Sequence, residues 1–202
     1  MESFLNTDNI ARSEGAVEYH PLKPCIDGET RVLFLGSFPP QRKRWAKGFD
    51  FFYPNFINDH WRIMGLIFHG DKDHLVDVEA KTYRIDRVLR LVRERHIGYY
   101  DTSEAVRRLK DNASDKFLEV VEQTDINALV SRAPKLKAIA VTGQKAAGTL
   151  CDYFGITEPP RMGECIEIGG LGLWRLPSSS RAYPMKMEEK AEYYRKMFDF
   201  VY

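Results

Sequence analysis

Short apolar runs alternate with stretches in which apolar and polar residues follow a helical period. The runs at 32–35, 136–141 and 171–176 are almost wholly apolar and predict strands. Lys81 to Arg95 and Met187 to Phe200 instead carry apolar residues on one helical face and charged residues on the other. Strands that alternate with helices predict a sheet covered by helices on both faces.

Turn and capping signals place the remaining elements. A strand ending at Asp101 is expected, and a hairpin of 165–168 with 171–176 around Gly169-Gly170. Further helices are expected at 61–68, at 104–109 behind a Ser103 cap, around 117–121 behind Ser114 or Asp115, at 124–130 and at 144–154.

Two small-residue and proline turns each follow an apolar run. The first is Gly36-Ser37-Phe38-Pro39-Pro40, and the second is Leu176-Pro177-Ser178-Ser179-Ser180. Such turns expose backbone N–H groups at the ends of strands. On one open sheet they would form a crevice at the carboxyl ends of the strands, where ligands bind in this class of fold.

The segment between residues 37 and 60 is a long loop rich in aromatic residues, which is typical of a functional loop. Phe49 and Phe51 are expected to pack as a small core beneath it. Phe52 or Tyr53 is expected to be a stacking platform, because a flat ring accepts the face of a planar base.

Polar residues at the end of this loop are candidates for chemistry. The amide of Asn58 can donate and accept hydrogen bonds, so it can hold a water, although capping a helix ahead of Trp61 is the simpler role. Asp59 is a candidate general base, or only a partner of the helix dipole. His60 is expected to be structural or solvated.

Cations near both turns favour contact with DNA phosphates. Arg42 and Arg44 lie in a cationic stretch that also contains Trp45, and Arg181 follows the serine turn. Pro177, Ser178, Ser179 and Ser180 can present N–H and hydroxyl groups to a phosphate. Solvated surface positions remain the alternative for both segments.

Composition limits the class of protein. The 202 residues, 44% hydrophobic and 29% charged, suit a single globular domain over 1–202, with 1–30 as an N-terminal lead-in. A net charge of +1 means that a nucleic-acid surface must be local. Three scattered cysteines give no support for a metal site, and no cofactor is expected. We find no signal peptide or membrane-spanning run and expect a cytoplasmic protein.

Together these motifs resemble the uracil-DNA glycosylase superfamily. Residues 32–61, V-L-F-L-G-S-F-P-P to F-F-Y-P-N-F-I-N-D-H-W, resemble its first motif and are most similar to the hypoxanthine-DNA glycosylase branch. The segments that resemble the rest of that branch are 97–101, Arg107/Arg108 with Ser114-Asp115, 138–143 and 176–180. In three positions the chain departs from the branch: Pro40 replaces a small polar residue, Thr142 replaces an Asn, and Arg181 replaces a Pro.

The resemblance implies a three-layer α/β/α fold with a central, mostly parallel four-stranded sheet. It also implies a monofunctional DNA glycosylase of base excision repair that hydrolyses the N-glycosidic bond of a flipped-out uracil, hypoxanthine or xanthine. Ser37 and the N–H of Phe38 would contact the base, Thr142 would supply one hydroxyl to its edge, and Asn58 would position water.

Two other functions stay open at this point. The chain could be a catalytically weak or inactive member that only binds nucleic acid, or a hydrolase of free nucleosides. The expected partner is DNA with a deaminated base, acted on by a monomer without a membrane.

Overall fold

The computed structural model describes residues 16–109 and 117–202 and has a five-stranded central sheet. The strand order is β5 (Ile97–Asp101), β2 (Val32–Gly36), β8 (Ala138–Thr142), β10 (Leu171–Leu176) and β9 (Cys165–Ile168). The first four strands are parallel, and β9 pairs antiparallel with β10. The expected number of four strands is therefore wrong, because the predicted hairpin adds β9 at the sheet edge.

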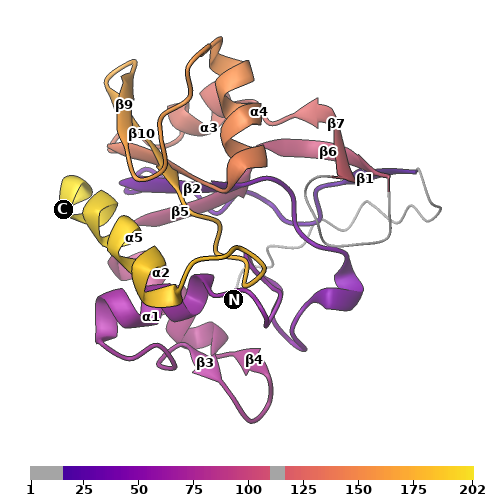
Figure 1. Cartoon of the computed structure of the whole chain (residues 1–202), viewed down its shortest axis with the longest axis vertical. Helices are drawn as coiled ribbons and strands as arrows, with labels where there is room; N and C mark the ends of the chain where they lie inside the picture. Colours follow the sequence, from indigo (N-terminus) through magenta and orange to yellow (C-terminus); the bar gives the residue numbers. More distant parts are fainter. Residues whose placement is uncertain (1–15, 110–116) are drawn as a thin grey trace.

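Helices cover both faces of this sheet, as the alternation of strands and helices predicts (Figure 1). On one face lie α1 (His60–His69), α2 (Ile85–Glu94) and α5 (Met187–Val201), and α5 packs against α1. On the other face lie α3 (Ile126–Ser131) and α4 (Gln144–Phe154). No helix within 16–109 and 117–202 is long and apolar enough to cross a bilayer.

A second sheet replaces two expected helices. It consists of β1 (Val17–Tyr19), β6 (Ser103–Arg108) and β7 (Leu118–Gln123), in the order β1-β6-β7. The predictions of helices at 104–109 and around 117–121 were wrong, because β6 makes antiparallel ladders with both neighbours. Such long-range pairing outweighs a weak local preference. Ser114 and Asp115 lie outside the described residues.

The smaller elements complete the loops. They are the 3-10 helix η1 (Arg42–Arg44) and the short antiparallel pair β3 (Val76–Asp77) and β4 (Thr82–Tyr83). Phe49 and Phe51 are fully buried, as predicted, and pack against Trp61. The Trp61 indole also donates to the Phe52 carbonyl at 3.0 Å, which fixes the aromatic loop to α1.

The parallel register brings the functional turns to one edge of the sheet. Gly36 pairs with Asp101, and Thr142 pairs with Leu176, so the carboxyl ends of β2, β5, β8 and β10 are level. The expected crevice therefore has a structural basis at this edge.

We expect Gly98→Ala to lower the free energy of unfolding by about 1–3 kcal/mol, because overpacking a tight site is destabilising. A Cβ there would lie 2.8 Å from Thr30 Cγ2 and 3.2 Å from the Cys25 carbonyl oxygen. Urea denaturation measures the change. As a control, Gly148→Ala in α4 meets nothing within 4 Å and should stabilise the protein by up to about 1 kcal/mol. Equal effects of the two substitutions would contradict the packing argument.

Candidate active site

The carboxyl ends of the parallel strands open into a cleft with a volume of about 1110 Å³. Eleven of the residues singled out in the sequence line it: Ser37, Phe38, Arg44, Phe52, Tyr53, Asn58, Thr142, Ser178, Ser179, Ser180 and Arg181. Asp59, Pro177 and Arg42 are not among its lining residues. The structure thus brings both predicted turns to one cavity.

The two turns contact each other directly through the backbone. Asp59 N–H donates to the Ser179 carbonyl at 2.9 Å, and Asn58 forms an antiparallel bridge with Ser180. This contact fixes the start of α1 against the serine turn, so the polar groups of both segments share one wall of the cleft.

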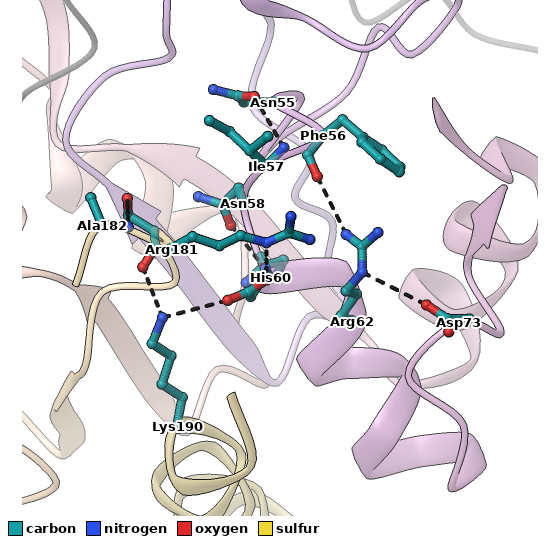
Figure 2. Close-up of polar contacts among 12 residues, drawn as sticks. Asn55, Phe56, Ile57, Asn58, His60, Arg62, Asp73, Arg181, Ala182 and Lys190 are labelled. Atoms are coloured by element: carbon teal, nitrogen blue, oxygen red, sulfur yellow. Dashed lines mark hydrogen bonds and ion pairs between the residues drawn. The ribbon is translucent and has the colours of Figure 1, made fainter. Parts of the chain in front are cut away.

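Asn58 combines the two roles that the sequence left open. Its Oδ1 accepts from the His60 backbone N–H at 2.9 Å and so caps α1. Because the partner is a donor, the capping atom is the oxygen, and the NH₂ group points away from it (Figure 2). That NH₂ group has no hydrogen-bond partner among the described residues, which leaves it available to a ligand in the cleft.

Asp59 is part of a buried charge cluster. Its carboxylate lies 2.8 Å from Arg181 Nε and 3.6 Å from Lys190 Nζ (Figure 2). Lys190, only 1% exposed, also donates to the Ser180 carbonyl at 2.8 Å. Burial lowers the pKa of Lys190, and the Asp59 charge opposes that shift. Because both its charge partners are structural and it does not line the cleft, Asp59 holds the turns together, and we leave the role of general base out of the proposal.

The sequence contains a signal for Lys190 that the analysis missed. Lys190 lies on the buried face of α5, together with Ala191, Tyr194, Met197, Phe198 and Val201. A lysine at an apolar position of an amphipathic helix requires an anionic or carbonyl partner. The identity of that partner is not readable, since Asp59 lies far away in the sequence.

Tyr53 is the more accessible of the two expected stacking platforms. Phe52 is only 3% exposed and stacks on Tyr99, so it belongs mainly to the core. The Tyr53 ring stacks on His60 with centroids 3.8 Å apart, so a base could use only its opposite face. Its φ of 53° is uncommon for a residue with a side chain and marks strain at the cleft.

Thr142 and the serine hydroxyls already have partners within the protein. Thr142 Oγ1 lies 2.8 Å from the Tyr53 hydroxyl. Ser178 Oγ accepts from Ser180 N–H at 3.3 Å, and Ser180 Oγ accepts from Ala182 N–H at 3.2 Å. These bonds shape the serine turn, while a hydroxyl retains further capacity for a ligand.

The cationic loop divides between structure and cleft. Arg42 pairs with Asp50 at 2.7 Å and stacks over Trp45 at 4.1 Å, whereas Arg44 lines the cleft. Of these two arginines, Arg44 is therefore the better placed for a ligand.

A buried histidine–carboxylate pair is a further feature that the sequence analysis missed. His20 Nε2 lies 2.8 Å from Asp101 Oδ2, and Asp101 lines the cleft. His20 stands in the polar lead-in, 81 residues before its partner, and no local pattern connects the two. Across the described ranges, no three His, Cys, Asp or Glu side chains gather as metal ligands would.

We expect Lys190→Met to lower the free energy of unfolding by about 3 kcal/mol, because it removes a buried cation and leaves the Ser180 carbonyl unpaired. Urea denaturation measures the loss, and hydrogen exchange at the Asp59 amide should become faster as the two turns separate. Lys186→Met, at an exposed position preceding the same helix, should change stability by less than about 0.5 kcal/mol. An unchanged Asp59 exchange rate would contradict the clamping role of Lys190.

We also expect stability to fall in acid because of His60. Burial lowers the pKa of His60 to about 3, and its Nε2 lies 3.0 Å from the Tyr99 hydroxyl. The unfolded chain takes up a proton below about pH 6.5 and the folded protein only near pH 3, so this stability is complete above 6.5 and is lost toward 3. His60→Phe keeps the ring and should flatten the profile by roughly 2–3 kcal/mol at pH 4.5, measured by urea denaturation. An equally steep profile in the variant would exclude His60 as the cause.

Comparison with known proteins supports the fold. No protein-family model matches the sequence, and no curated protein matches it. The structure is similar to the solution NMR structure of a candidate uracil DNA glycosylase from Methanosarcina acetivorans, with a TM-score of 0.60 and 24% sequence identity. The match covers 91% of this chain and 99% of that chain. The two chains therefore share one mixed α/β fold over nearly their whole length.

Proposed function

We propose that this protein is a monofunctional DNA glycosylase that hydrolyses the N-glycosidic bond of a flipped-out deaminated base: uracil, hypoxanthine or xanthine. The observation that carries the proposal is Asn58, whose oxygen caps α1 while its NH₂ group has no partner among the residues described. The serine turn and the ring of Tyr53 line the same cleft. The shared fold with the Methanosarcina protein supports this reaction class.

The proposed reaction separates departure of the base from attack by water. The C1′–N bond breaks first, so the sugar gains positive charge and the base leaves with the electron pair. The N–H of Phe38 and the hydroxyl of Ser37 would stabilise the negative charge on the base, as donors do in an oxyanion hole. The base would stack on the face of Tyr53 opposite His60, with the Thr142 hydroxyl at its edge.

Asn58 would position the attacking water without a general base. Its NH₂ can donate to one lone pair of the water oxygen, and its capped Oδ1 keeps a second lone pair for a water proton. A sugar cation is reactive enough for neutral water, so the carboxylate of Asp59 is not required in this step. The water proton is released to solvent, and the base is protonated there.

The rim of the cleft would bind the DNA backbone. The serine turn, Pro177 to Ser180, would present N–H groups to a phosphate beside the flipped nucleotide. Arg181 and Arg44 would add charge, with Arg42 further along the same loop. Because the net charge is only +1, binding would depend on these local cations.

The other functions are distinguished by substrate. A nucleic-acid-binding protein would bind DNA in a salt-sensitive way and release no base, and the residue Thr142 in place of the branch's Asn is the feature that favours it. A nucleoside hydrolase would cleave free deoxyuridine or deoxyinosine but not the same base in DNA. A monomer in the cytoplasm remains the predicted form.

We expect Asn58→Ala to lower the rate of base release about 10²- to 10³-fold while DNA affinity changes little, because the NH₂ group acts only on the water. Oligonucleotides carrying one uracil, hypoxanthine or xanthine, followed by alkali cleavage, measure release, and fluorescence anisotropy measures binding.

Two control variants separate chemistry from capping. Asn58→Ser keeps a good cap but has no amide, so it should fold normally and remain slow. Asn55→Ala removes a similar turn at the adjacent Ile57 N–H, and its rate should stay close to that of the wild type. Full activity of Asn58→Ser would reduce Asn58 to a cap, and no release of any base by the wild type would favour the binding protein.

A further inference from the structure

Asp101 is a buried carboxylate that is only half satisfied within the protein. It ends β5, is 8% exposed and lines the cleft. Its Oδ2 accepts from His20 Nε2 at 2.8 Å, whereas Oδ1 has no donor anywhere in the described part of the chain. A buried acceptor without a partner is costly, so Oδ1 is suited to a donor supplied by a ligand.

The surroundings of Asp101 give its carboxylate one fixed orientation. His20 is 2% exposed, and its Nδ1 lies 2.8 Å from the Leu22 carbonyl oxygen and 3.1 Å from the Leu22 nitrogen. Its ring packs on Tyr100 with centroids 4.5 Å apart. On the other side Oδ1 lies against Gly36, where any Cβ would overlap it. The carboxylate therefore cannot turn away from the cleft, which is the preorganisation that a recognition group needs.

The position of Asp101 fits the edge of a stacked base. The adjacent strand leads into the turn with Ser37, and the next one ends at Thr142, which bonds to Tyr53. These residues line the same cleft as Asp101. A planar base on the Tyr53 ring would thus present its edge to the ends of the strands, where Asp101 Oδ1 is the acceptor without a donor.

We propose that Asp101, oriented by His20, accepts a hydrogen bond from the ring N–H of the flipped base and so selects a deaminated base against its parent. This inference rests on the proposed function and assigns the specificity of that site. Deamination of cytosine or adenine turns a ring nitrogen with a lone pair into an N–H donor. An ionised carboxylate has only acceptors, so it attracts the product and repels the parent.

The test pairs a substitution with removal of the donor from the substrate. The wild type and Asp101→Ala are assayed on uracil and 2-pyrimidinone, or on hypoxanthine and purine, in otherwise identical oligonucleotides. The second base of each pair lacks the ring N–H. The ratio of the two rates in each protein is compared, because this cancels the different intrinsic stabilities of the glycosidic bonds. We expect Asp101→Ala to slow release of the deaminated base about 10- to 100-fold and to reduce the preference within the pair by a similar factor.

Matched variants separate recognition from charge and folding. Asp152→Ala removes an exposed carboxylate in α4 at the cleft and should preserve both the rate and the preference. Asp101→Asn keeps the shape of the side chain, and its amide can donate to a parent base, so discrimination between uracil and cytosine or between hypoxanthine and adenine should fall. Unfolding in urea verifies that each variant folds.

Each outcome bears on the inference differently from the proposed function. If Asp101→Ala and Asp101→Asn release the lesion with the wild-type preference, the inference is wrong and the glycosylase proposal stands. If His20→Gln leaves the rate and the preference unchanged, His20 is not a positioning residue. If the wild type releases none of the deaminated bases, both the function and the inference built on it are overturned.

Discussion

The cleft depends on one buried set of charges, in which Asp59 lies between Lys190 and Arg181. Charges removed from water are tolerated only when they are paired, so the three segments that carry them must come together. Those segments are the start of α1, the serine turn and the first turn of α5. The two turns that line the cleft are 122 residues apart, and Lys190 fixes one against the other through the Ser180 carbonyl. Docking of α5 is therefore a condition for a formed site.

The same constraint extends inward from Asp59 to the ring that faces the cleft. Asp59 N–H binds the serine turn, and the next residue, His60, lies beneath the ring of Tyr53. Burial keeps His60 neutral, because its pKa is lowered to about 3, so its Nε2 can share a hydrogen bond with Tyr99 without adding a cation to the core. The strained backbone of Tyr53 is held by these contacts and by Thr142. The site is thus supported by packing on the sheet side and by charges on the helix side.

How far the sequence predicts this structure depends on the range of each interaction. The strands β2, β8 and β10, the helix α4 and both turns follow from local hydrophobic runs and from glycine or proline, and all were predicted. The strands β6 and β7 were not, because their ladder with β1 joins segments about 90 residues apart in sequence. In the site, Asn58 and the turns were found from local motifs. Lys190 with Asp59, and His20 with Asp101, depend on pairs that only the fold brings together.

Asn58 shows why structural and chemical roles need not compete in this cleft. A carboxamide has two different ends, and the fold uses one of them: the oxygen caps α1, which fixes the direction of the NH₂ group. The cap therefore supplies the orientation that positioning a water would require. Asp101 follows the same logic, since His20 occupies one oxygen and thereby aims the other at the cleft. In both residues, the half that is satisfied inside the protein determines where the remaining half can act.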